Sequence, residues 1–226
     1  MSMGLRLASG PLGIALGYAW IRGLVPPYLF LSLLALALIG AFLAVCDGLC
    51  RTRRSRFLYL FLCAAAGVLA WDRTASVWLA RHELERSEPQ VRGGIVLQTT
   101  GYTCVPSSAA TCLKALGIEA AEAELAREAY TSTTGTSFGR MGWVIGRRLK
   151  GSGWKYRHAG RARWEDLTAP ALLDVDHGGI RHAVAFLGFA PDGRARIGDP
   201  LSGEYAETRA SLESRWSGEA VFFERR

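Results

Sequence analysis

The chain has 226 residues, half of them hydrophobic, and a formal net charge of +7. This length suits one compact domain with an appendage. Residues 1–82 hold eight of the 27 basic side chains but only two of the 20 acidic ones, so residues 83–226 are nearly balanced. Because the basic excess lies in the hydrophobic part, the remainder lacks the positive surface that binds phosphate backbones, and we expect no nucleic-acid partner.

Uncharged runs near the amino terminus predict a membrane anchor. Residues 23–46 carry no charge, and 24 residues are enough for a helix to cross a hydrocarbon core of roughly 30 Å. Residues 57–71 form a shorter second run, and residues 7–21 a third, which spans, lies in the interface or serves as a signal-like start. We therefore expect two or three transmembrane helices over residues 1–82.

Charge placement predicts the orientation of this anchor. Four arginines lie between the two stronger runs, in residues 51–56, and such a loop faces the cytoplasm. The chain after Trp71 then emerges on the opposite side. Together with an arginine-rich and lysine-poor composition, this predicts a multi-pass protein of a bacterial inner (cytoplasmic) membrane, with its carboxy-terminal domain on the periplasmic or extracellular side.

The rest of the chain predicts helices first and strands afterwards. Residues 83–94 are charged, end in two glycines and indicate a linker. After a short strand at 95–97, hydrophobic spacing and turn signals predict helices at 105–116, at 120–129 and from 138 onward, and strands at 171–175, 182–189, 195–198 and 220–223. This order favours an α+β domain over residues 95–226, with helices packed on an antiparallel sheet.

Two cysteines of this domain differ in their placement. Cys104 and Cys112 lie eight residues apart on one predicted helix, so their Cα atoms are about 12 Å apart and cannot be joined by a disulfide. Cys104 opens the helix, where the positive end of the helix dipole favours the thiolate, the reactive form. Cys112 falls on the apolar face. We interpret Cys104 as a nucleophile and Cys112 as a core residue.

Three further residues complete a catalytic constellation. His182 begins an apolar strand, and an imidazole with an ordinary pKa near ~6.5 serves as a general base and then as an acid. A hairpin would bring Asp199 beside it to orient the ring. Gln98, six residues before Cys104, supplies an amide donor that, with the Cys104 backbone N–H, forms an oxyanion hole.

Other chemistries are less well supported by the sequence. A metal site built from Asp174, Asp176, His177 and His182 matches no strong ligand spacing, and no Gly-x-Ser-x-Gly elbow indicates a serine hydrolase. We expect no cofactor and no metal. A peptidase-like domain that does not cleave, and binds peptides for a secretion or assembly system, remains the alternative.

The ordered residues resemble the bacteriocin-processing, double-glycine leader cysteine peptidases, a papain-like family. There a glutamine precedes the nucleophilic cysteine by six positions, a small-residue helix follows, and a strand that begins with histidine leads to Asp-Pro. The likeness runs from residue 95 to residue 223 and includes Thr-Gly-Thr-Ser at 134–137. It implies a papain-like fold in which nucleophile, base, orienting acid and oxyanion donor are Cys104, His182, Asp199 and Gln98.

The resemblance also implies an activity. We expect a cysteine peptidase that cleaves a peptide or protein outside the cytoplasm, with small residues such as Gly-Gly as a candidate cleavage site and a secretion system as a candidate partner. The chain contains no Gly-x-x-x-x-Gly-Lys-Ser/Thr loop, so we expect a stand-alone member rather than part of an ATP-driven exporter. Val105 stands where the family often has glycine.

Overall fold

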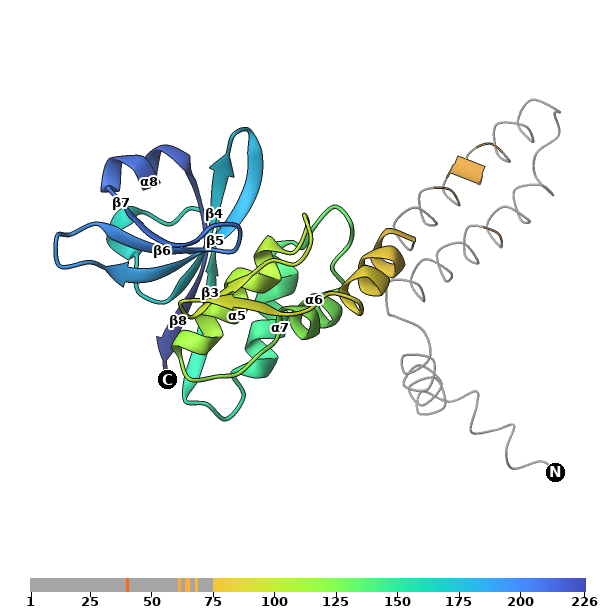
Figure 1. Ribbon diagram of the computed structural model, residues 1–226, viewed down its shortest axis with the longest axis horizontal. Coiled ribbons are helices and arrows are strands. Elements are labelled where there is room, and N and C mark those ends of the chain that lie inside the picture. The colour runs from red at the N-terminus through yellow and green to blue at the C-terminus, as the bar shows by residue number, and fades with distance from the viewer. Residues whose placement is uncertain (1–39, 41–60, 62–63, 66–67, 69–74) are drawn as a thin grey trace. The chain divides into compact units, whose positions relative to one another are not determined.

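The computed structural model describes residues 40, 61, 64–65, 68 and 75–226 (Figure 1). The contacts divide the chain into two units, residues 1–75 and residues 76–226. The candidate site lies wholly in the second unit. The predicted anchor, residues 1–82, falls for the most part outside the described residues.

Helices occupy the first half of the second unit. Residues 75–84 are helical, and three helices follow: α5 (Cys104–Ala115), α6 (Glu122–Glu128) and α7 (Phe138–Arg148). Gly117, at φ +75°, lies just past α5, in a conformation that glycine adopts without strain. The Ser137 hydroxyl accepts a hydrogen bond from the Arg140 N–H at the start of α7, as a helix-capping side chain does. These helices lie within a few residues of the predicted ones.

Strands form a six-stranded antiparallel sheet in the second half. Its spatial order is β3 (Trp154–Ala159), β8 (Trp216–Arg225), β4 (Ala171–His177), β5 (Ile180–Phe189), β6 (Ala195–Asp199) and β7 (Gly203–Glu207). A separate hairpin pairs β1 (Gln90–Arg92) with β2 (Ile95–Leu97), and two short helices, η1 (Trp164–Asp166) and α8 (Arg209–Arg215), lie between strands. The α+β class with an antiparallel sheet is confirmed.

Hydrophobic side chains on both faces of the sheet form the core. Leu172 packs with residues of α5 and α7, whereas its neighbour Leu173 packs with Phe186 and with Leu212 of α8. Alternate residues of one strand point to opposite faces, so β4 is covered on both sides. Figure 1 shows α5, α6 and α7 grouped beside the strands, with α8 near β7. Because α5 packs on one face of the sheet, its first residue lies beside the central strands.

Several elements differ from the sequence prediction. Strand β3 was not predicted because its side chains are mostly exposed and show no apolar alternation. Strand β7 and helix α8 are short and were not predicted either. The range 83–94, predicted as a linker, includes the end of the helix over residues 75–84 and strand β1. Gly93 and Gly94 form the β1–β2 turn, with φ of +58° and +88°.

The predicted localisation needs correction. No helix in the described part of the chain is long and apolar enough to cross a bilayer, and this finding contradicts the predicted multi-pass membrane placement. The longest helix that lies wholly within residues 76–226, α5, has 12 residues and measures about 18 Å, against the roughly 30 Å that a span requires. The uncharged runs that prompted the prediction, 23–46 and 57–71, lie almost entirely outside the described residues.

Candidate active site

Cys104 is the first residue of α5 and is half-buried. The loop before it is held by Thr103, whose hydroxyl donates to the Thr100 carbonyl at 3.2 Å and whose carbonyl accepts from the Ser107 N–H at 3.0 Å. No acidic residue lies in the first turn of α5. The positive end of the helix dipole is therefore not neutralised from within the helix at the position of the sulfur.

His182 and Asp199 come together through two neighbouring strands. His182 lies near the start of β5 and Asp199 at the end of β6, and the two strands are paired through Ala185 and Gly198. The imidazole Nε2 lies 2.9 Å from Oδ1 of Asp199. The same carboxylate oxygen accepts the Leu201 N–H at 2.8 Å. The pairing predicted from the hairpin is therefore present in the structure.

The electrostatics of this pair favour a charged imidazole. Burial by itself lowers the pKa of His182, but hydrogen bonds and charge interactions with Asp199 and Cys104 outweigh it and raise the pKa to about 9. For Asp199 burial acts in the raising direction, and the contacts with His182 and Leu201 overcome it, so the pKa of this carboxyl is lowered. Because the Nε2 of His182 is hydrogen-bonded to Asp199, its Nδ1 is the ring nitrogen that can exchange a proton with the Cys104 sulfur.

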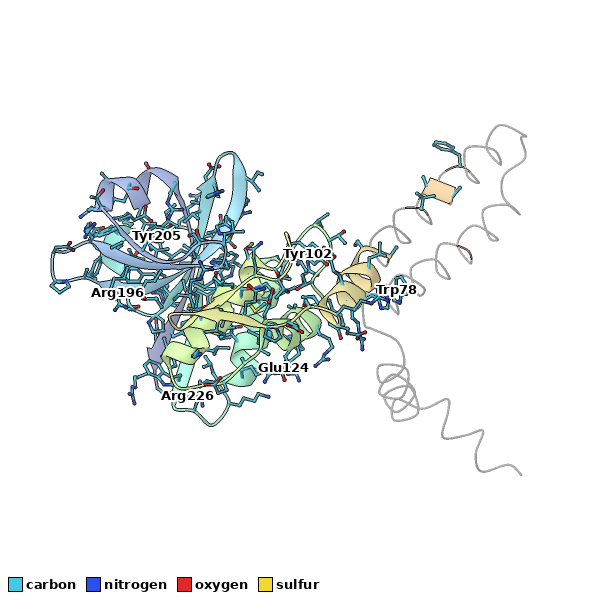
Figure 2. The ribbon with its side chains drawn as sticks, viewed as in Figure 1. Trp78, Tyr102, Glu124, Arg196, Tyr205 and Arg226 are labelled. Carbon is cyan, nitrogen blue, oxygen red and sulfur yellow. The ribbon has the colours of Figure 1, made fainter. Side chains whose placement is uncertain are left out.

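Cys104 and His182 line one cavity of about 500 Å³. Its walls are the loop around Tyr102, which Figure 2 labels, the turn 133–138, and the beginning of β5. The charged residues on these walls are Arg140, Asp174, Arg181 and Glu219. The cavity therefore gives a substrate access to both groups of the candidate nucleophile–base pair.

Asp174 and Arg181 form an ion pair on the cavity wall. Arg181 donates to both carboxylate oxygens of Asp174, at 2.7–3.1 Å, and reaches Glu219 at 2.5 Å. The Asp176 side chain accepts the Gly179 N–H within the hairpin turn. These acids of the rejected metal-site interpretation thus have other partners. No group of three or more histidine, cysteine or acidic side chains among the described residues is arranged to hold a metal ion.

Gln98 lies on the loop before α5 but is not among the residues that line the cavity. Its side-chain Nε2 donates to the Thr100 carbonyl at 2.7 Å, and its backbone N–H donates to the Pro200 carbonyl at 2.8 Å. Its Oε1 is buried and has no hydrogen-bond partner in the structure. An amide nitrogen carries two hydrogens, so one N–H remains for another acceptor. Its role as an oxyanion donor stays a prediction.

Two residues near the site, Tyr102 and Glu122, were not singled out by the sequence. Tyr102 lines the cavity and donates to Glu83 at 2.5 Å. His177, which the sequence raised only as a metal ligand, packs its ring against His182 with centroids 5.6 Å apart. Glu122 on α6 binds the loop that carries Gln98. Each of these contacts joins segments distant in sequence or depends on a turn, so no local spacing pattern marks them.

A cysteine that opens a helix, facing a histidine and an aspartate on an antiparallel sheet, is the arrangement of the papain-like class of cysteine peptidase domains. The chain belongs to the Peptidase_C39 like family, whose family model matches residues 94–219. The resemblance inferred from the sequence is thereby confirmed.

Similar proteins include two relatives from Methanothermobacter. An uncharacterized protein of Methanothermobacter marburgensis is 30% identical over 131 residues, which cover 58% of this chain and 88% of the relative. An uncharacterized protein of Methanothermobacter thermautotrophicus is 28% identical over 132 residues, with the same two coverages.

Similar solved structures are peptidase domains of transporters. The peptidase domain of Streptococcus ComA, a bi-functional ABC transporter of a quorum-sensing pathway, is 23% identical with a TM-score of 0.48, covering 57% of this chain and 96% of that domain. A double glycine motif protease from an AMS/PCAT transporter, solved with its leader peptide, is 18% identical with a TM-score of 0.49, covering 62% of this chain and 94% of that protein.

Proposed function

We propose that this protein is a cysteine peptidase that cleaves a peptide or protein substrate with Cys104 as nucleophile. The observation that carries the proposal is the shared cavity of Cys104 and His182, together with the 2.9 Å contact between His182 and Asp199. Membership in a peptidase family supports it. A nucleophile, a base in contact with it and a third group that orients the base are the parts that covalent peptide hydrolysis needs.

Each residue has a defined step in the proposed reaction. The Cys104 thiolate attacks the scissile carbonyl carbon, and the carbonyl oxygen becomes an oxyanion that accepts hydrogen bonds from the Cys104 backbone N–H and the Gln98 amide. When this intermediate collapses, protonated His182 gives its proton to the leaving amine, and an acyl-enzyme remains. His182 then takes a proton from water, which attacks the thioester and releases the acid and the free thiolate. Asp199 holds the ring in position throughout.

The proposed substrate class rests on the resemblance of the sequence to double-glycine leader peptidases. We propose an extended peptide with small residues, such as Gly-Gly, before the cleaved bond, supplied by a secretion system or a similar partner. The test is to incubate the full-length protein with peptides that contain Gly-Gly at one position, beside matched peptides with Leu-Leu there. Cleavage of the first set alone supports this substrate class, and equal cleavage of both contradicts it.

A test of the catalytic pair does not need the substrate. The full-length protein is treated with iodoacetamide over a range of pH, and mass spectrometry of the peptide that contains Cys104 follows its alkylation. We expect alkylation of Cys104 at pH 6 to be much faster in the wild-type protein than in His182→Ala. Equal alkylation rates in the two proteins at every pH would contradict the pair.

Cleavage and alkylation together separate the two functional alternatives. A reactive Cys104 with peptide cleavage that is lost in Cys104→Ala supports the peptidase. Peptide binding without any cleavage that depends on Cys104 would instead support the non-cleaving peptide-binding domain.

A further inference from the structure

The loop that carries Gln98 is bound by a buried acid from another helix. Glu122 is the first residue of α6, and its side-chain Oε1 accepts the Thr99 backbone N–H at 2.9 Å and the Thr99 hydroxyl at 3.2 Å. We propose that Glu122 is a positioning residue, which fixes Thr99 and thereby holds the neighbouring Gln98 where its amide can stabilise the oxyanion. This inference rests on the proposed peptidase function.

The burial of Glu122 indicates that its carboxylate stabilises the loop rather than its own helix. Glu122 is only 3% exposed, and the ion pairs of the described residues do not include it. Burying a carboxylate is costly, and the favourable interaction with the helix dipole offsets only a small part of that cost. Hydrogen bonds from Thr99 to the Glu122 oxygen oppose the remaining cost, because bonds to a charged group are the stronger kind.

Contacts on both Gln98 and Thr99 hold the loop. The Gln98 backbone N–H donates to the Pro200 carbonyl, directly after Asp199, and the Gln98 amide donates to the Thr100 carbonyl. Thr99 is bound by Glu122, and its hydroxyl also lies 3.1 Å from the Ser87 hydroxyl. Of these contacts only those of Glu122 accept the Thr99 backbone N–H, so removing its carboxylate would loosen the loop and let the Gln98 amide move. The hydrogen bond between His182 and Asp199 does not involve Glu122 and would remain.

This separation gives the inference a specific readout. Alkylation by iodoacetamide displaces iodide at a saturated carbon, so no oxyanion forms and the rate reports only the Cys104 thiolate and its histidine. Peptide cleavage forms an oxyanion at the carbonyl oxygen, so its rate also depends on the Gln98 amide. A residue that acts through Gln98 must therefore change the second rate and leave the first unchanged, which a general loss of structure would not do.

The experiment compares variants of the full-length protein in both assays, with thermal unfolding of each. In Glu122→Ala we expect kcat for peptide cleavage to fall about 10- to 100-fold, less than the 10²- to 10³-fold typical when an oxyanion donor is removed outright, with alkylation of Cys104 within twofold of wild type. Glu122→Gln keeps an oxygen acceptor for Thr99 and is expected to recover most of the activity. The matched control is Glu124→Ala on the same helix (Figure 2), where the acid pairs with Arg148 at 3.0 Å and is half-exposed.

A double variant tests the route of the effect. If Glu122 acts through the amide, Glu122→Ala causes no further loss of cleavage in a Gln98→Ala background. Should Glu122→Ala not fold, Thr99→Val decides, because it keeps the shape of the side chain and removes its hydroxyl contacts with Glu122 and Ser87. We expect a smaller fall in kcat with alkylation unchanged, and no such fall in Ser87→Ala, which removes the second contact alone.

The outcomes distinguish the inference from the function on which it rests. Wild-type cleavage in Glu122→Ala, or a parallel loss of cleavage and alkylation, overturns the positioning role while leaving the peptidase intact. Cleavage unaffected by Gln98→Ala removes the oxyanion role and the inference with it. Absence of any Cys104-dependent cleavage in the wild-type protein overturns the proposed function itself, and the positioning role falls with it.

Discussion

Replacing Asp199 by asparagine removes one negative charge beside His182 and almost nothing else. Asparagine has the same shape, and its side-chain oxygen can still accept the Leu201 N–H and a proton of the His182 ring. Both His182 and Asp199 are nearly buried, with side chains 7% exposed, so water cannot replace the lost charge. The change in the pKa of His182 on this substitution therefore measures how strongly the Asp199 carboxylate stabilises the charged imidazole.

The size of the effect follows from the pKa of His182. Burial acts to lower this pKa, and contacts with Asp199 and Cys104 raise it to about 9 from an ordinary value of 6.5. At about 1.4 kcal/mol per pKa unit, the difference corresponds to about 3 kcal/mol in favour of the protonated ring. A hydrogen bond to a charged group contributes about 1.5–3 kcal/mol, so we expect the pKa of His182 in Asp199→Asn to fall to between about 7 and 8.

The same difference predicts how stability depends on pH. The pKa of His182 is raised in the folded protein, so its contribution to stability is complete below about pH 6.5 and is lost as the pH rises through about 9. The lowered pKa of Asp199 reflects the same contact, so its contribution to stability is not added to that of His182. The contribution of Asp199 is present at neutral pH and is lost in acid. In Asp199→Asn the loss of stability between pH 6.5 and pH 9 should shrink by roughly 40–80%.

The assay is an NMR titration of the His182 ring protons in full-length protein, assigned with His182→Gln. Cys104→Ala is the companion variant, because it removes the other group that raises this pKa and should lower it as well. Urea unfolding at pH 6.5 and at pH 9 provides the stability comparison. A midpoint that stays near 9 in Asp199→Asn would refute the reasoning, because the carboxylate would then contribute nothing to the charged ring.

Three further predictions concern residues around the site. Cys112 is fully buried, and burial raises its pKa, so it should stay unmodified by iodoacetamide at pH 8 until the protein is denatured, as peptide mass spectrometry would show. Gly198→Ala would place a Cβ 2.8 Å from Cδ1 of Ile95, so we expect the free energy of unfolding in urea to fall by about 1–3 kcal/mol. Adding Ile95→Val should recover part of this loss, and full stability of the single variant would contradict the packing. Arg181→Gln leaves the buried Asp174 without its cation and should lower the free energy of unfolding by about 1–3 kcal/mol. If the ion pair is the cause, adding Asp174→Asn should restore most of that stability.

The sequence was sufficient for the elements in which local signals agree. Helix α5 was predicted within a residue at each end because small and apolar residues recur at helical spacing and Gly117 follows its end. Cys112 was placed in the core by the same spacing and has no exposed surface. The contact of His182 with Asp199 was predicted from the hairpin between their strands, because a short antiparallel connection brings its two ends side by side.

Contacts between distant segments could not be predicted in this way. Strand β3 is paired only with β8, and its exposed residues carry no alternating pattern, so nothing in the segment itself distinguishes it from a loop. Glu122 belongs to an alanine-rich helix in which an acid near the start is common, and only the packing of α6 against the loop shows that its carboxylate binds Thr99. Tertiary contact, not local preference, determines both.

The proposed catalytic pair is assembled from two parts of the fold, and one buried hydrogen bond joins those parts close to the site. Cys104 belongs to the helical layer and His182 to the sheet, so their separation depends on how α5 packs against β5. One turn beyond Cys104, the Ser108 hydroxyl donates to the Ala183 carbonyl at 2.9 Å, directly after His182. Because this bond is buried and lies one helical turn from the sulfur and one residue from the imidazole, it limits sliding of the helix along the strand where that motion would separate the pair. The small residues of α5 therefore have two roles, since they allow close packing on the sheet and supply the hydroxyl that fixes its register.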